Sequence, residues 1–274
     1  MTRLNCGSHL LDLSSPVVMG ILNLTPDSFF DGGRYPDTAS RISQVEKMIG
    51  DGASIIDIGA VSTRPKAIPV SQEEELARLI PVIDMLCREF PAMIFSADTF
   101  RAEVARAAVE HGAGMINDVY GGRFGAAMLE TVATLKVPYV LMHMKGTPEN
   151  MQDNPGYSDV FAEVSYFFEQ QLARCRDKGV LQVILDPGFG FGKNTEHNFT
   201  LLSRFDEFRS EGVPLLAGLS RKSMINKVLH ATPENALNGT TVLNTIALLK
   251  GADILRVHDV KEAVEAVRLV GMTG

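Results

Sequence analysis

Short apolar segments of strand length alternate along the chain with longer segments whose apolar residues recur every three or four positions. The short segments are rich in Val, Ile and Leu, which is typical of strands buried on both faces of a sheet. They occupy residues 17–22, 55–58, 94–97, 115–116, 139–142, 183–185, 215–219 and 254–257. The longer segments predict helices at residues 39–49, 72–90, 102–110, 124–135, 160–176, 196–209, 237–249 and 260–270. The order strand then helix is therefore repeated eight times.

A glycine follows the end of several predicted helices by no more than three residues, as glycines do in left-handed helix caps. These glycines are Gly52, Gly112, Gly179, Gly212 and Gly251. Regular alternation without a linker favours a (β/α)8 barrel over an open doubly wound sheet, which usually has fewer strands and a dinucleotide-type first turn. We therefore predict an α/β fold of the TIM-barrel type over residues 17–271. A β-hairpin within residues 1–16, turning at Gly7 and Ser8, precedes it, so that residues 1–274 form a single domain.

The composition is that of an ordinary globular protein, since 45% of the 274 residues are hydrophobic and 22% are charged. A net charge of −7 argues against a nucleic-acid-binding surface, so an anionic ligand would need a local group of basic side chains. The three cysteines are far apart and lack metal-ligand spacing, which suits a reducing compartment. We find no signal-peptide core and no run of roughly 20 apolar residues, and therefore predict a cytoplasmic protein without membrane contact.

Polar residues stand at the ends of nearly all the predicted strands. They are Asn23, Asp57, Asp98, Asn117 with Asp118, His143, Asp186, Ser220 with Lys222, and Arg256 with His258. Singly, each is explained as a turn or helix-capping residue. Together they would meet at the carboxyl end of a barrel, where such enzymes build their active sites and where the last two strands commonly bind phosphate. One side of the predicted site thus carries carboxylates and amides, and the other carries cations.

This division predicts a ligand with a planar head rich in hydrogen-bond donors and an anionic tail. A carboxylate can accept two parallel N–H bonds from an aminopyrimidine-like edge. Arg256 and His258 would neutralise a phosphate group, and Asn23 offers a neutral oxygen suited to holding Mg²⁺ on a diphosphate. No two histidines have zinc-ligand spacing, so we expect no zinc. His143, between Met142 and Met144, suits packing as well as chemistry.

Asp186 directly follows an apolar strand and precedes a glycine-rich stretch that ends at Lys193. The spacing does not match a phosphate-binding Walker loop, because Pro187 stands where its first glycine is needed and Asn194 replaces the hydroxyl residue. The dinucleotide fingerprint also fails, since its third glycine would be Lys193. We predict instead that the glycines form a tight turn beside a ligand held by Asp186.

These motifs, in this order, resemble those of the dihydropteroate synthase family of pterin-binding enzymes over residues 17–270. They are Asn-Leu-Thr-Pro-Asp-Ser-Phe at 23–29, Ser-Thr-Arg-Pro at 62–65, Asp-Thr at 98–99, Asn-Asp at 117–118, Met-His-Met at 142–144, Asp-Pro-Gly at 186–188, Ser-Arg-Lys-Ser at 220–223 and Arg-Val-His-Asp at 256–259. The resemblance implies condensation of 6-hydroxymethyl-7,8-dihydropterin pyrophosphate with p-aminobenzoate, giving 7,8-dihydropteroate and pyrophosphate in folate biosynthesis. It also implies Mg²⁺ as cofactor, inhibition by sulfonamides and a homodimer.

The resemblance assigns site residues by role. The pterin would be bound by Asp98, Asn117, Met142, Asp186, Lys222 and Arg256. The diphosphate would be bound by Asn23, which also holds the metal, and by Thr63, Arg64, Arg256 and His258. The p-aminobenzoate would be bound by Phe29, Thr63, Pro65, Phe191, Lys222 and Ser223, with Ser223 placed just before a helix that starts at Met224. The catalytic residues would be Arg64, Asp98, Lys222, Arg256 and His258, and two loops, 25–35 and 62–66, would close over the site.

An arylamine is a weak, uncharged nucleophile, so stabilising the departing pyrophosphate should dominate, and we expect dissociative substitution without a covalent intermediate. The alternatives are a pterin-dependent methyltransferase barrel, a non-catalytic pterin-binding paralogue, and an aldolase in which Arg221 depresses the pKa of Lys222. Asp57 is either a site residue or a partner of Arg64. The chain departs from the family pattern at Phe30, Ala60, Val61 and Phe100.

Overall fold

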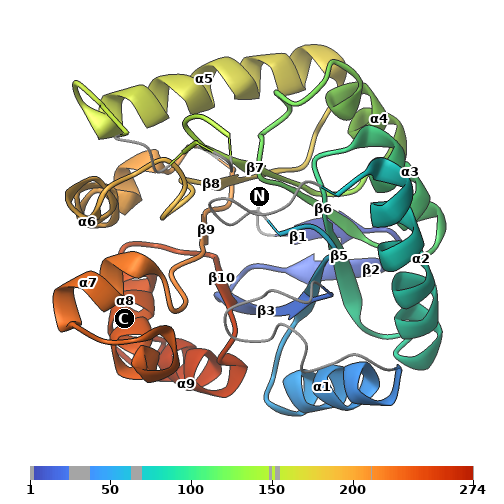
Figure 1. The fold of residues 1–274 in the computed structure, drawn as a ribbon, viewed down its shortest axis with the longest axis horizontal. Helices are drawn as coiled ribbons and strands as arrows, with labels where there is room; N and C mark the ends of the chain where they lie inside the picture. Colours follow the sequence, from blue (N-terminus) through green and yellow to red (C-terminus); the bar gives the residue numbers. More distant parts are fainter. Residues whose placement is uncertain are drawn as a thin grey trace.

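The computed structural model describes residues 3–24, 38–62, 70–147, 150–151, 155–210 and 212–273. Figure 1 shows the strands at the centre with the helices around them. The strands are β1 Arg3–Cys6, β2 His9–Asp12, β3 Val17–Asn23, β4 Ile55–Gly59, β5 Ile94–Asp98, β6 Met115–Asp118, β7 Tyr139–Met142, β8 Val183–Asp186, β9 Leu216–Ala217 and β10 Ile254–Val257. The α-helices are α1 Thr38–Gly50, α2 Gln72–Glu89, α3 Ala102–Glu110, α4 Ala127–Leu135, α5 Val160–Lys178, α6 Thr195–Ser203, α7 Ser223–Leu229, α8 Leu237–Leu249 and α9 Val260–Val270.

Eight parallel strands form one sheet in the order β8-β7-β6-β5-β4-β3-β10-β9. A parallel bridge between Leu185 and Leu215 joins the two outer strands, so the sheet is nearly closed on itself. Outward-facing residues such as Ile56 and Ile58 pack against the helices in one large apolar cluster. The predicted (β/α)8 barrel is confirmed.

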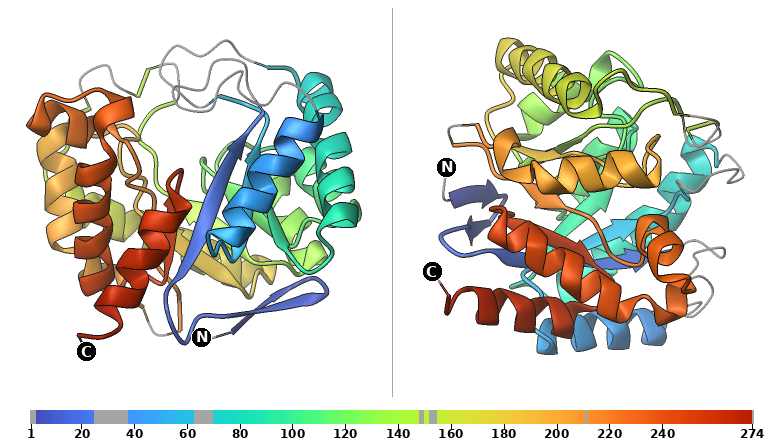
Figure 2. Two further views of the ribbon diagram at one scale, coloured as in Figure 1. Left: turned by 90° about the horizontal axis from the view of Figure 1, so that it is seen from below. Right: turned by 90° about the vertical axis from the view of Figure 1, so that its left-hand side faces the viewer.

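The lower end of the barrel interior is filled by one apolar residue from each strand. This layer consists of Met19, Ile55, Ile94, Met115, Val140, Ile184, Leu216 and Ile254. The antiparallel hairpin β1–β2 crosses this end (Figure 2, left) and adds Leu4 and Leu11 to the same cluster. Cys6 pairs with His9 across the turn, and Gly7 has a φ of +68°, so the predicted hairpin is confirmed at the expected turn.

The hairpin is tied to the barrel by its backbone. The amide nitrogen of Asn5 donates to Gln182 Oε1 over 2.6 Å, and Gln182 Nε2 donates back to the carbonyl of Asn5 over 3.2 Å. Because Gln182 directly precedes β8, these bonds fix the hairpin against the base of the sheet. The barrel is therefore plugged at the end where its strands begin.

Three predicted segments differ most from the structure. The helix predicted at 196–209 ends at Ser203 and continues as a 3-10 turn, Phe205–Phe208, which buries both of its phenylalanines. The helix predicted from 124 begins at Ala127, because Gly125 disfavours helical backbone. The strand predicted at 215–219 is ladder-paired only at Leu216–Ala217. Within the described ranges, no helix combines the length and apolarity needed to cross a membrane.

Candidate active site

The polar site is the second layer of the barrel interior. Inward-facing side chains of a strand lie two residues apart, so each strand's next inward position stands directly above the apolar layer. These positions are Ile21, Asp57, Ser96, Asn117, Met142, Asp186, Gly218 and Arg256. Most of them, with residues at the strand ends beyond, line one cavity. Its lining is Ile21, Asn23, Val61, Ser62, Asp98, Asn117, Val119, Met142, Asp186, Phe191, Gly218, Lys222, Arg256 and His258.

Arg256 lies between two carboxylates, Asp57 of β4 and Asp98 of the neighbouring strand β5. Its Nε donates to Asp57 Oδ2 over 2.6 Å, and its Nη2 donates to Asp98 Oδ2 over 2.8 Å. Asn117 Nδ2 donates to the same Asp57 oxygen over 2.9 Å. Asp57 is fully buried, and it therefore positions Arg256 and Asn117 from beneath the cavity. Arg64, its other expected partner, lies outside the described residues.

Asp98 and Arg256 each stabilise the charged form of the other. Burial raises the pKa of Asp98 to about 7, against the opposing attraction of Arg256 and with a further upward contribution from Asp57. A carboxyl that titrates near neutrality can change its hydrogen-bonding role within the physiological pH range. The cation beside it favours the ionised, accepting form.

Asp186 and Lys222 face the same point from β8 and from the turn after β9. A Cβ built on Gly218 would lie 3.7 Å from Lys222 Nζ and 4.0 Å from Asp186 Oδ2. Burial lowers the pKa of Lys222 to about 8, although Asp186 raises it, and Arg256 lowers it further. The expectation that Arg221 depresses this pKa is wrong, because the Arg221 guanidinium is paired with Asp259.

The glycine-rich turn after Asp186 packs backbone to backbone against the end of β7. A Cβ on Gly188 would lie 1.9 Å from the carbonyl oxygen of His143, and one on Gly192 would lie 2.2 Å from that of Lys145. Only glycine fits at such distances, and both residues have positive φ. Asp186 Oδ1 accepts the amide of Gly188 over 2.7 Å, so the turn and the carboxylate are held together.

Lys193 stabilises this turn from the protein interior. None of the predictions from the sequence assigned it a role. It is 2% exposed, and its Nζ donates to the carbonyls of Gly188 and Phe191, both over 3.0 Å. Nζ also lies 2.9 Å from His143 Nδ1. Burial, and then the charge of Lys193, lowers the pKa of His143 well below its ordinary value, so the ring is neutral and Nδ1 accepts. The one feature of the sequence that could have indicated this role is the position of the lysine directly after Gly192.

Replacing Lys193 with methionine is expected to lower the free energy of unfolding by about 3 kcal/mol, because buried carbonyls lose their donor. Urea unfolding measures the change. Lys178→Met is the matched control: Lys178 is 49% exposed and pairs with Glu130 on the surface, so its loss should cost less than about 0.5 kcal/mol. Equal losses in the two variants would refute the role of Lys193 as a clamp.

An apolar cluster borders the cavity on the side of β5 to β7. It contains Phe100, Val119, Met142, Met144 and Met151, with Val61, Tyr120 and Phe191 packed against it. The Phe100 ring contacts that of Tyr120 at 4.8 Å between centroids. Val61 and Phe100, two of the departures from the family pattern, thus belong to one cluster and are accommodated together.

The structure brings most of the predicted site residues to one cavity, but not all of them. Asn23, Asp98, Asn117, Met142, Asp186, Phe191, Lys222, Arg256 and His258 line it. Phe29, Thr63, Arg64 and Pro65 lie outside the described residues, as do most of the two predicted loops. Ser223 is exposed and is absent from the described lining. It is the first residue of α7, whose N-cap is Lys222, so the predicted helix start at Met224 is wrong by one residue.

Comparison with known proteins places this geometry among relatives. A family model described as "Pterin binding enzyme" matches residues 19–258. The chain is 49% identical over 265 residues to dihydropteroate synthase of Escherichia coli (strain K12), covering 96% of this chain and 93% of the relative. Yersinia pestis dihydropteroate synthase, solved with a sulfonamide drug, has a TM-score of 0.95 at 43% identity, with 99% and 98% of the chains covered. The Xanthomonas albilineans enzyme with 4-aminobenzoic acid has a TM-score of 0.92 at the same identity and coverage.

Proposed function

The chain belongs to the pterin-binding enzyme family and, within it, to the dihydropteroate synthases, and from this premise we propose the reaction and the role of each site residue. The reaction condenses 6-hydroxymethyl-7,8-dihydropterin pyrophosphate with p-aminobenzoate to give 7,8-dihydropteroate and pyrophosphate, a step of folate biosynthesis. The observation that carries the assignment is one cavity whose lining combines Asp186 and Asn117 with the basic side chains of Arg256 and His258. It has the chemistry for a flat, donor-rich ring and an anionic tail.

The pterin ring is assigned to the second layer of the barrel. Asp186 accepts two parallel N–H bonds from the aminopyrimidine edge, a pairing that a carboxylate satisfies with both oxygens. Asn117 supplies a donor and an acceptor, and its amide is already oriented by Asp57. Lys222, beside Asp186, donates to a ring oxygen or nitrogen, and Met142 provides an apolar contact for the ring face.

The diphosphate is assigned to the rim above Arg256, where His258 and Asn23 also face the cavity. Thr63 and Arg64 complete this set by family resemblance. A guanidinium and an imidazole N–H stabilise the negative charge that builds on the leaving group. Because Arg256 is held by two carboxylates before any ligand binds, little reorganisation is needed when that charge appears.

Magnesium fits this rim as an ion carried chiefly by the substrate. Among the residues that the structure describes, no group of three or more His, Cys, Asp or Glu side chains could hold a metal alone. Asn23 offers one neutral oxygen, and Mg²⁺ usually completes its octahedron with phosphate oxygens and water. When bound, the ion neutralises charge on the departing pyrophosphate.

The chemical step is substitution at the pterin methylene carbon. The bond from carbon to the diphosphate oxygen breaks, the arylamine nitrogen forms the new bond, and one amine proton is released. No side chain among the described lining residues needs to act as a nucleophile, since stabilising the leaving group and delocalising a developing cation into the pterin suffice. We propose dissociative substitution without a covalent enzyme intermediate, in which Asp98 and Asp186 orient and polarise the ring.

The second substrate is assigned to the outer part of the cavity, beside Phe191 and Lys222. Lys222 Nζ lies 4.8 Å from the centroid of the Phe191 ring, so an apolar wall and a cation are adjacent there. Phe29, Thr63, Pro65 and Ser223 complete the assignment by family resemblance. Sulfonamides, which imitate p-aminobenzoate in shape and charge, are proposed as inhibitors.

Pyrophosphate release is the deciding assay. The protein is incubated with dihydropterin pyrophosphate, p-aminobenzoate and Mg²⁺, with and without EDTA. We expect release that requires both substrates, falls in EDTA and returns with added Mg²⁺. No release above background would overturn the synthase assignment, and full release in EDTA would remove only the metal.

The pH dependence of kcat/KM is expected to be a narrow bell. Activity should rise as Asp98 ionises, with a pKa of about 7, and fall as Lys222 loses its proton, with a pKa of about 8. Lys222→Arg stays protonated and should lose the alkaline limb while keeping the acid one. Initial rates at limiting pterin substrate test this, and a profile unchanged in Lys222→Arg would contradict the assignment.

A homodimer through α7 and α8, in the cytoplasm, completes the proposal. The two helices lie together (Figure 1), and large apolar side chains are exposed on them: Val228, Leu229, Val242, Ile246 and Leu249. In α8 these residues recur at three- and four-residue spacing and so share one face. Light scattering should give twice the chain mass of 29.8 kDa. The three free cysteines suit a reducing compartment.

A further inference from the structure

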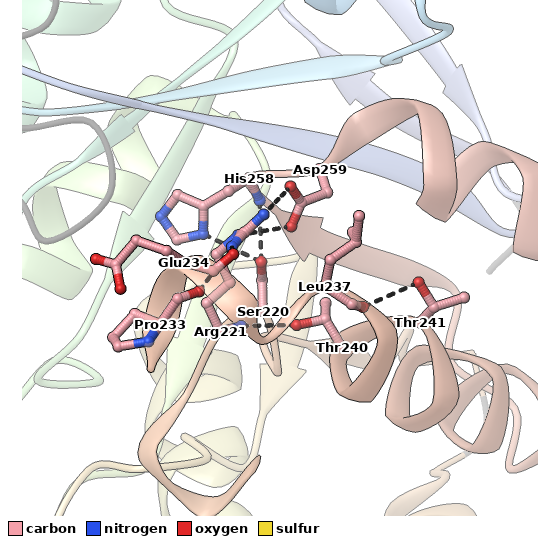
Figure 3. Close-up of polar contacts among 9 residues, drawn as sticks. All are labelled: Ser220, Arg221, Pro233, Glu234, Leu237, Thr240, Thr241, His258 and Asp259. Carbon is pink, nitrogen blue, oxygen red and sulfur yellow. Dashed lines mark hydrogen bonds and ion pairs between the residues drawn. The ribbon is translucent and has the colours of Figure 1, made fainter. Parts of the chain in front are cut away.

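Ser220 and His258 stand side by side at the ends of the last two barrel strands. Ser220 Oγ lies 3.1 Å from His258 Nδ1, and the backbone nitrogen of His258 donates to the same oxygen over 3.2 Å (Figure 3). One hydroxyl therefore contacts both the main chain and the ring of the histidine. His258 lines the proposed diphosphate rim, whereas Ser220 is not part of the described cavity lining.

The hydroxyl hydrogen of Ser220 has to be accounted for, because the residue is only 6% exposed. Buried hydroxyl groups almost always donate to a partner. The backbone N–H of His258 is a donor and cannot receive that hydrogen, so Oγ accepts there. Within the described part of the chain, the acceptor placed in range is His258 Nδ1. If Nδ1 accepts, the neutral imidazole carries its hydrogen on Nε2.

We propose that Ser220 is a positioning residue that holds His258 as the Nε2–H tautomer, so that the ring offers an N–H donor to the anionic group of the substrate. The inference rests on the proposed function, which makes that group a diphosphate. Phosphate oxygens at neutral pH are acceptors, so an Nε2 lone pair would repel them whereas an N–H binds them. Groups that bond the far nitrogen of a histidine commonly set its tautomer in this way.

The two turns that carry this pair are cross-linked by an ion pair. Arg221 Nε and Nη2 donate to the two oxygens of Asp259, over 2.9 and 2.6 Å, and both side chains are about nine-tenths buried. Arg221 follows Ser220 and Asp259 follows His258, so the forked contact fixes the spacing of their neighbours. The fold itself thus holds Ser220 and His258 within hydrogen-bonding distance.

Further bonds hold Arg221 in a backbone conformation that is unusual for a side chain of its size. Its φ is +55°, in the left-handed region. Its Nη1 donates to the carbonyls of Pro233 and Glu234, over 2.6 and 2.9 Å, and its backbone N–H donates to Thr240 Oγ1 over 3.0 Å. Figure 3 shows these contacts surrounding the serine. This network offsets the strain and holds Ser220 where its Oγ lies 3.1 Å from His258 Nδ1.

The tautomer can be read by nitrogen NMR of protein labelled with ¹⁵N-histidine. The chain has six histidines, and His258→Gln identifies the signals of interest. At a pH where the rings are neutral, the parent should show the Nε2–H pattern at His258. Ser220→Ala should show a mixture of both tautomers, and Ser220→Thr, which keeps the hydroxyl, should restore the parent pattern. Thr241→Val is the control, because that hydroxyl donates only to the carbonyl of Leu237 within its own helix.

Kinetics provides the second readout. Ser220→Ala should lower kcat/KM for the pterin diphosphate by about tenfold, as expected for one lost charge-assisted hydrogen bond, with KM for p-aminobenzoate unchanged. Ser220→Thr and Thr241→Val should remain within about twofold of the parent. The rescue by threonine separates positioning from misfolding.

An Nδ1–H pattern in the parent, or an identical tautomer in Ser220→Ala, would overturn the inference. That outcome would leave the synthase assignment intact, since pyrophosphate release is measured separately. Conversely, absence of pyrophosphate release would remove the proposed function while the tautomer spectrum still reports on Ser220.

Discussion

Arg256→Met is expected to reduce kcat for pyrophosphate release by roughly 1,000-fold, the largest effect of any single change in the site. The substitution removes a cation from the diphosphate rim and leaves two carboxylates, Asp57 and Asp98, without their cationic partner. Breaking such a buried pair should also lower the free energy of unfolding by about 3–5 kcal/mol. Steady-state assays with saturating substrates and urea unfolding measure the two effects independently.

A double variant separates these effects. Asp57→Asn keeps the shape of the buried partner and removes one negative charge, so adding it to Arg256→Met should recover part of the lost stability. It restores no cation to the rim and should recover none of the rate. Recovery of rate together with stability would show that Arg256 acts through folding alone, and would contradict its assigned role at the leaving group.

Asp186→Asn is expected to weaken binding of the dihydropterin about 100-fold. The amide keeps one oxygen for the Gly188 N–H but replaces the other with a donor, which meets the donor edge of the ring and Lys222. A lost charge-assisted pair with a new repulsive contact is worth roughly 2–3 kcal/mol. Isothermal titration calorimetry, in which the pterin substrate is added to protein without p-aminobenzoate, measures Kd directly.

Asp118→Asn is the matched control for a buried aspartate at a strand end. Asp118 accepts the hydroxyl of Tyr139 over 2.6 Å and the amide of Gly122 over 2.8 Å, and it is absent from the described cavity lining. The substitution should lower stability and leave dihydropterin affinity unchanged. Equal affinity of Asp186→Asn and the parent would refute the ring-binding role of Asp186.

The alternative functions considered from the sequence find no support. The relatives compared are dihydropteroate synthases, at 49% identity in Escherichia coli and with a TM-score of 0.95 in Yersinia pestis. An aldolase would need Lys222 as a free nucleophile, whereas its Nζ donates to the carbonyl of Phe189 and faces Asp186.

The strand positions were predictable because parallel barrel strands are apolar on both faces and are bounded by turn residues. The polar layer followed from the same pattern, since a carboxylate such as Asp186 ends an otherwise apolar strand. Pairings across the barrel were not predictable. Asp57 and Arg256 are 199 residues apart, and they meet because β10 pairs with β3, which pairs with β4. Asp57 was therefore left with two possible roles.

Local geometry set the other limits of prediction. Nothing in the sequence marks Lys193 as buried, and only the close approach of Gly188 to His143 makes it a buried donor to carbonyl oxygens. The start of α7 was misplaced because a serine is a common N-cap, whereas here the extended residue before the helix is Lys222. The extended backbone of Lys222 at that cap lets its side chain reach toward Asp186. No local sequence pattern predicted this orientation.

The hairpin beneath the barrel affects the order in which the two substrates bind. Because Leu4, Leu11 and the apolar layer fill the lower end of the described barrel, we expect both substrates to enter the cavity from the rim. In the proposed binding mode, a pterin on Asp186 and Asn117 would lie deeper than an arylamine beside Phe191, which belongs to the turn past the strand ends. The pterin is therefore expected to bind first, since an arylamine already in place would obstruct its path. We therefore expect ordered binding, in which p-aminobenzoate binds second and closes off the bound pterin.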